Sequence, residues 1–131
     1  MILSFKSLSH HAFTAEFDAN APVNLTGEVI KVEWINPHAW VHLEVEENGK
    51  KTTWMVEGGT PNTLIRNGIT KQSIKPGTVI VVRGYQSKGN LCHPRCIANG
   101  RDVTFPDGRK VFMGSSGTGA PRDGADPRER R

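Results

Sequence analysis

The chain has 131 residues, of which 36% are hydrophobic and 23% charged, and its 17 basic and 13 acidic side chains give a net charge of +4. This length fits one ordinary domain, which buries a core without needing disulfides or a metal. No stretch approaches the roughly 20 apolar residues that a transmembrane helix requires, so we expect no membrane span. The basic excess is diffuse, which is weak evidence for polyanion binding.

The first nine residues are interpreted as the remnant of a signal peptide or as a flexible arm. They lack the apolar run of about 7–15 residues that a complete secretory signal contains. However, Ser7 and Ser9 put small side chains where a cleavage before His10 would need them. We therefore expect a periplasmic or secreted protein, and the alternative is a cytoplasmic protein with an ordinary arm at residues 1–9.

Three segments in the first half of the chain have the pattern of strands. Residues 25–34, LTGEVIKVEW, are rich in β-branched side chains. Residues 38–46 alternate between apolar and polar side chains, which predicts one core-facing and one outward face. The Asn-Gly pair at residues 48–49 is typical of hairpin turns, so residues 51–57 are predicted as the return strand.

A short helix is predicted at residues 60–68. Thr60 is a candidate N-cap, Pro61 suits the first turn, and Gly68 follows the expected end. A second small helical turn is expected at residues 70–74.

Shorter extended segments follow. Residues 78–85, TVIVVRGY, and residues 101–105 are predicted strands. An irregular loop is expected between them at residues 91–99. The sequence Pro-Asp-Gly at residues 106–108 then turns the chain into a last short strand at residues 109–112.

Three strands, a short helix and two further strands follow the order of a five-stranded OB barrel. We therefore predict an all-β, OB-like barrel at residues 10–113, with the short helix between strands three and four and an extra C-terminal hairpin. An open β-sandwich is the alternative. Residues 114–131 lack aliphatic side chains larger than Ala and are predicted to be a disordered tail. The expected core, counting immediate neighbours, contains Val29, Val41, Leu43, Val56, Val79 and Val81, with Leu64 or Ile65 closing the barrel's end.

Three motifs resemble those of a family of small exported bacterial proteins of unknown function. They are a paired-histidine start, His-His-Ala-Phe, at residues 10–13, the sequence Asn-Pro-His-Ala-Trp at residues 36–40, and Pro-Asp-Gly-Arg-Lys at residues 106–110. The similarity extends from His10 to Phe112. It implies a fold and an exported location, and it implies no reaction.

The histidines are the leading candidates for a binding site. Cleavage before His10 would leave an α-amino group beside an imidazole, a chelating pair for copper, and His11 and His38 would complete the site. Copper is the first metal to test because nitrogen ligands favour Cu²⁺ over Zn²⁺ and Ni²⁺. Trp40 and His42 are candidate ligand-binding residues on the outward face of the second strand. The alternative is that His10 and His11 only mark the start of the folded chain, His38 fixes a turn and His42 is solvated.

Two cysteines, Cys92 and Cys96, are close enough in sequence to close a small loop. An exported location favours a disulfide between them. Free thiols and a metal site are the alternatives, although the sequence around them offers at most three zinc ligands.

The tryptophans allow a structural and a functional interpretation. Trp34 and Trp54 are expected to fill the barrel, and Trp40 to cap one end. Aromatic side chains on an OB barrel also stack nucleic-acid bases. Residues 25–57 carry three lysines against six glutamates, which argues against nucleic acid because cations supply most of that affinity.

We therefore expect an exported binding module that holds a small ligand or a metal ion near His10, His11 and His38. The alternative is an interaction scaffold, or an accessory subunit of another exported protein, in which the histidines are structural. A single-stranded nucleic-acid-binding domain is the third hypothesis. No nucleophile with a partner base is evident in the sequence, so an enzyme is the weaker expectation.

Overall fold

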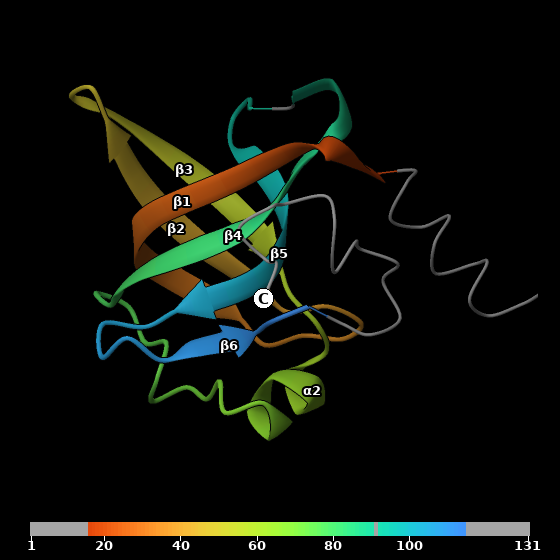
Figure 1. Ribbon diagram of the computed structural model, residues 1–131, viewed down its shortest axis with the longest axis vertical. Helices are drawn as coiled ribbons and strands as arrows, with labels where there is room; N and C mark the ends of the chain where they lie inside the picture. Colours follow the sequence, from red (N-terminus) through yellow and green to blue (C-terminus); the bar gives the residue numbers. More distant parts are fainter. Residues whose placement is uncertain (1–15, 91, 115–131) are drawn as a thin grey trace, which may run out of the picture.

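The computed structural model describes residues 16–90 and 92–114, which form a barrel of β-strands (Figure 1). No helix in these residues is long and apolar enough to cross a membrane. The predicted N-terminal arm, His10, His11 and the predicted tail from residue 115 lie outside the described residues. In chain order the elements are β1 (Phe17–Glu33), β2 (Trp40–Glu47), β3 (Lys50–Glu57), α2 (Pro61–Arg66), β4 (Val79–Ser87), η1 (Lys88–Asn90), β5 (Cys96–Thr104) and β6 (Lys110–Phe112).

Five of the strands form a closed ring. The β1 strand pairs antiparallel with β2 and with β4, β2 pairs antiparallel with β3, and β4 with β5. A parallel pairing between β3 and β5 closes the ring, and β6 adds to β5 outside it. The prediction of an all-β fold with a five-stranded barrel, one short helix between β3 and β4 and an extra C-terminal hairpin is therefore confirmed.

The core is built from the inward face of each strand. On β2, Val41, Leu43 and Val45 are buried, as the alternating sequence predicts. Trp54 and Val56 join them from β3. On β4 the main-core residues are Ile80 and Val82, the neighbours of the two valines named in the sequence-based core, whereas Val79 is 51% exposed. The other core residue named from the sequence, Val29, is also buried.

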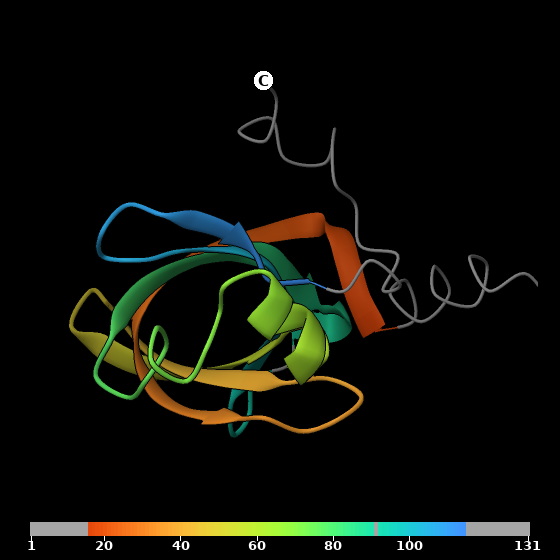
Figure 2. The ribbon, with the colours of Figure 1, turned by 90° about the horizontal axis from the view of Figure 1, so that it is seen from below.

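The short helix α2 covers one end of the barrel (Figure 2). Its N-terminus is capped as expected, because the Thr63 backbone N–H donates to the Thr60 hydroxyl at 3.1 Å. Leu64 is 1% exposed and belongs to the main core, whereas Ile65 is 53% exposed. Leu64 is therefore the residue that closes the barrel's end.

Two boundaries differ from the sequence-based prediction. The first strand starts at Phe17 instead of residue 25, and its register with β4 shifts between Phe17 and Pro22. The last long strand starts at Cys96, inside the segment expected to be an irregular loop. The Asn-Gly pair at residues 99–100 of this strand resembles a turn sequence. Packing nevertheless requires the glycine, because a Cβ at Gly100 would lie 2.7 Å from the Val56 side chain. A glycine that indicates a loop in the sequence thus permits a close approach within the barrel.

Candidate functional site

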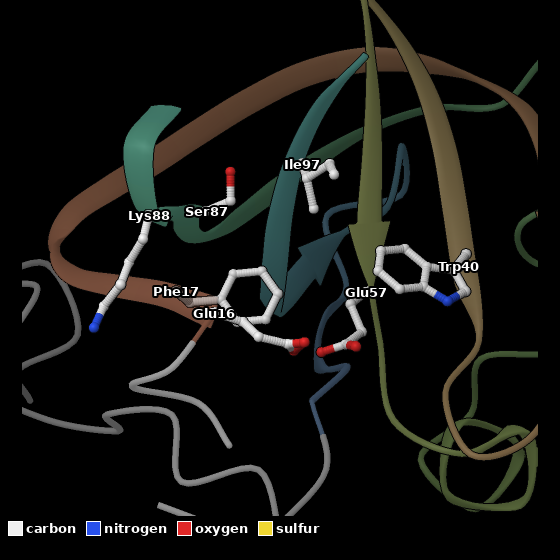
Figure 3. A pocket seen from close by; sticks show the side chains of 7 residues that line it. All are labelled: Glu16, Phe17, Trp40, Glu57, Ser87, Lys88 and Ile97. Carbon is white, nitrogen blue, oxygen red and sulfur yellow. The ribbon is translucent and has the colours of Figure 1, made fainter. Parts of the chain in front are cut away.

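A pocket of about 350 Å³ lies on the outer wall of the barrel, beside the start of β1 (Figure 3). We call it the outer pocket. It is lined by Glu16, Phe17, Trp40, Glu57, Ser87, Lys88 and Ile97.

Strand alternation explains why this pocket lies outside the barrel. Val41 and Val56 face the core, so their neighbours Trp40 and Glu57 face outward. Trp40 and Glu57 are also directly paired across the β2–β3 ladder. The parallel pairing of β3 with β5 sets Asn99 opposite Glu57. Residues from three strands are thereby brought together on one outer face.

An apolar wall is supplied by a second, smaller hydrophobic cluster. Phe17 and Tyr85 are both buried in it, and Ala19 and Ile97 pack against them. Because Phe17 pairs with Ser87 in the ladder, the beginning of β1 is held against the end of β4. Glu16, the residue before Phe17, therefore reaches the same pocket.

The central polar residue is Glu57, which is 8% exposed. Its Oε1 accepts a hydrogen bond of 3.2 Å from the Asn99 side-chain amide. Burial raises the pKa of Glu57, and the nearby Glu16 carboxylate raises it further, whereas His38 and the Asn99 hydrogen bond lower it. The carboxylates of Glu16 and Glu57 point toward one another in Figure 3. A cation between these two carboxylates would relieve their repulsion.

Two polar atoms near Glu57 are buried without a hydrogen-bond partner in the described part of the chain. They are the hydroxyl of Ser87 and the side-chain oxygen of Asn99. Buried polar groups are nearly always paired, and leaving one unpaired costs about 1–3 kcal/mol. Ser87 lines the outer pocket, and its hydroxyl oxygen is itself buried.

His38 lies at the same end of the β2–β3 ladder as Glu57. Its Nδ1–H donates to the Gly58 carbonyl at 3.0 Å, and the backbone of Ala39 exchanges hydrogen bonds with Gly58 and Gly59. In a neutral ring held through Nδ1–H, the Nε2 atom carries a free lone pair. His38 is thus fixed near Glu57 with one nitrogen able to accept.

The described residues contain no group of three His, Cys, Asp or Glu side chains placed to hold a metal ion. His38 is the one member of the predicted His10, His11 and His38 set that the structure describes. A metal site at His38 would therefore need ligands from outside residues 16–90 and 92–114.

Of the two residues predicted to bind a ligand, Trp40 and His42, one lines this pocket. Trp40 lines the outer pocket, and His42 does not. The interpretation of His42 as a solvated residue is wrong, since it is 4% exposed. Its Nε2–H donates to Glu33 at 2.7 Å. This hydrogen bond lowers the pKa of Glu33, and it gives the buried imidazole a polar partner on the neighbouring strand.

Cys92 and Cys96 form a disulfide in the structure. Cys96 is buried at the start of β5, whereas Cys92 is exposed in the preceding loop. The bond therefore ties this loop to β5, the strand that also carries Ile97 and Asn99.

Sequence reasoning missed the polar centre of the pocket. Glu57 carried a usable signal, because it directly follows the apolar residues Trp-Met-Val and precedes Gly58 and Gly59. Ser87 and Asn99 carried none, since each lies in a segment without clear periodicity.

The fold and the pocket together define a small all-β barrel protein with a half-open, acid-containing pocket on its outer wall. The chain belongs to a family of unknown function, DUF6152, whose model matches residues 1–93. The matched part includes β1 to β4 and most residues of the outer pocket. No curated protein matches the chain.

Proposed function

We propose that this protein is an exported binding module that holds a small ligand or a metal ion at the outer pocket and the adjacent His38. The observation that carries the proposal is the buried Glu57 carboxyl, which faces the Glu16 carboxylate (Figure 3) and lies near a fixed histidine. Convergent polar groups of this kind within apolar walls are typical of ligand sites.

The size of the outer pocket supports a binding role. Its volume of about 350 Å³ lies at the lower end of the range of about 300–1,000 Å³ for small-molecule sites. The strand order also supports assignment to the OB class, because β1 pairs with both β2 and β4 and the helix follows β3. Barrels of that class commonly bind ligands on their outer strands.

A metal ion is the first ligand to test. Metal-binding histidines commonly donate their other ring N–H to a backbone carbonyl, as His38 does to Gly58. Glu16 lines the outer pocket, and His11 precedes it by five residues. A chain of that length spans at most about 18 Å, so the paired histidines are tethered near the site. With the α-amino group of His10 they would supply nitrogen ligands, for which Cu²⁺ is the favoured divalent ion.

The proposal of export has independent support. A disulfide between Cys92 and Cys96 is typical of periplasmic and secreted proteins and rare in the cytosol. The small residues Ser7 and Ser9 before His10 suit signal cleavage.

Calorimetric titration with Cu²⁺ tests the metal arm of the proposal. We expect protein beginning at His10 to bind one ion with a Kd tighter than about 1 µM. One alanine added before His10 displaces the amino group from the chelate, and His38→Ala removes an imidazole, so each should weaken binding at least about tenfold. His93→Ala is the control, because His93 is exposed in the disulfide loop. Equal affinities for all forms, or none tighter than micromolar, would contradict a copper site of this composition.

The second candidate is an interaction scaffold or accessory subunit with structural histidines. The hydrogen bond from His38 to the Gly58 carbonyl favours this second candidate, because the bond gives the imidazole a structural role without any ligand. In that case His38→Ala should lower the melting temperature without changing Cu²⁺ affinity.

A further inference from the structure

The polar atoms that face the outer pocket are mostly hydrogen-bond acceptors. Glu57 and Glu16 offer carboxylate oxygens, which point toward one another (Figure 3). A ligand that satisfies this set must bring several donors on one atom. A primary ammonium group has three N–H donors and a positive charge.

The remaining walls suit an apolar group. Phe17, Trp40 and Ile97 line the pocket, and in Figure 3 the rings of Phe17 and Trp40 flank the space in front of Glu57. Aromatic rings attract cations placed over their faces. A bare metal ion would leave these apolar walls unused.

Charge favours a cation over an anion at this position. Two carboxylates and one ammonium, that of Lys88, line the outer pocket. The Lys88 side chain extends away from Glu57 in Figure 3. The two carboxylates therefore lack a cation between them among the lining residues.

We propose that the outer pocket binds a small organic amine, with its ammonium group held between the carboxylates of Glu57 and Glu16 and its apolar body against Phe17 and Trp40 (Figure 3). This inference rests on the proposed binding function and names the class of its small ligand. Affinity should fall on acidification, because protonating Glu57 removes the charge that the ammonium meets. The other titratable groups that act on Glu57 are Glu16 and His38, whereas Lys88 lines the pocket with its side chain extending away (Figure 3).

NMR titration of the full chain with phenethylamine tests the inference, with phenethyl alcohol and phenylpropionate as neutral and anionic probes of similar shape. We expect the amine to shift the Trp40 indole signal with a Kd of about 1 mM or tighter. The alcohol and the acid should bind at least about tenfold more weakly.

Two variants separate recognition from folding. Glu57→Gln should weaken amine binding at least about tenfold, whereas Glu47→Gln, which removes an exposed carboxylate at the hairpin, should not. Glu57→Gln should also leave the melting temperature equal or higher at about pH 7, because it removes a carboxylate whose ionisation is disfavoured by burial.

The outcomes distinguish this inference from the function on which it rests. If all three probes bind equally, or if Glu57→Gln leaves amine affinity unchanged, the amine inference is wrong. If Cu²⁺ binds at His38 and the amine does not bind, the amine inference falls and the binding function stands. If neither binds, both fall.

Discussion

Replacing Leu64 with alanine should destabilise the protein by about 3–5 kcal/mol, the range measured when a fully buried leucine is truncated. Leu64 is the buried residue of α2, is 1% exposed, and packs into the core at the end of the barrel. The truncation loses the transfer free energy of the removed carbons and leaves a cavity beneath the helix. In a domain of about 100 residues each kcal/mol shifts the melting temperature by about 4–8 °C, so a fall of at least about 12 °C is expected.

Urea unfolding monitored by tryptophan fluorescence measures this loss. Ile65→Ala is the matched control, because the adjacent side chain is 53% exposed and its truncation should cost less than about 0.5 kcal/mol. If Leu64→Ala costs less than about 1 kcal/mol, or no more than the control, Leu64 does not close the barrel.

Three further predictions concern charge and covalent structure. Burial raises the pKa of Glu57, so the folded protein favours the protonated side chain. This contribution to stability is complete at pH values below the unfolded-state pKa and is lost as pH rises through the folded-state pKa. Glu57→Gln should therefore raise the free energy of unfolding more at about pH 7 than at about pH 4, and an equal effect at both pH values in urea unfolding would be contrary evidence. Removing the His42 hydrogen bond with His42→Ala should raise the pKa of Glu33, which NMR titration of its carboxyl carbon reports, and an unchanged pKa would refute that cause. Reducing the disulfide between Cys92 and Cys96 should cost about 2 kcal/mol for so small a loop, and alkylation of both thiols in unreduced protein would show that the bond is absent.

The parts of the fold that could be predicted are those where one local pattern decides the structure. The alternation from Val41 to Val45 identified β2 and its buried face, because only one face of that strand contacts the core. Thr60 and Pro61 identified the start of the helix through backbone capping, which depends on adjacent residues alone.

The start of β1 and the start of β5 could not be predicted because distant pairing determines them. Phe17 is in a strand since it pairs with Ser87 and packs on Tyr85. Cys96 begins a strand since β5 pairs with β3 in parallel, about forty residues away. Neither pairing can be predicted from neighbouring residues in the sequence.

The candidate site was predictable only in part for the same reason. His38 and Trp40 were identified from one motif at the start of β2, whereas Glu57, Ser87 and Asn99 come from three different strands. Their assembly depends on the closing of the barrel. The alternative of a solvated His42 failed because its hydrogen-bond partner, Glu33, lies on the neighbouring strand.

The central claim, that the outer pocket and His38 form a cation-binding site, is tested most directly by mapping bound cations with NMR. Paramagnetic Cu²⁺ broadens the signals of nearby residues, and a bound amine shifts them. The account predicts that one or both cations perturb His38, Glu57 and Trp40 and leave the hairpin turn at residues 48–49 unchanged. Perturbations confined to other surfaces, or none with either cation, would contradict it.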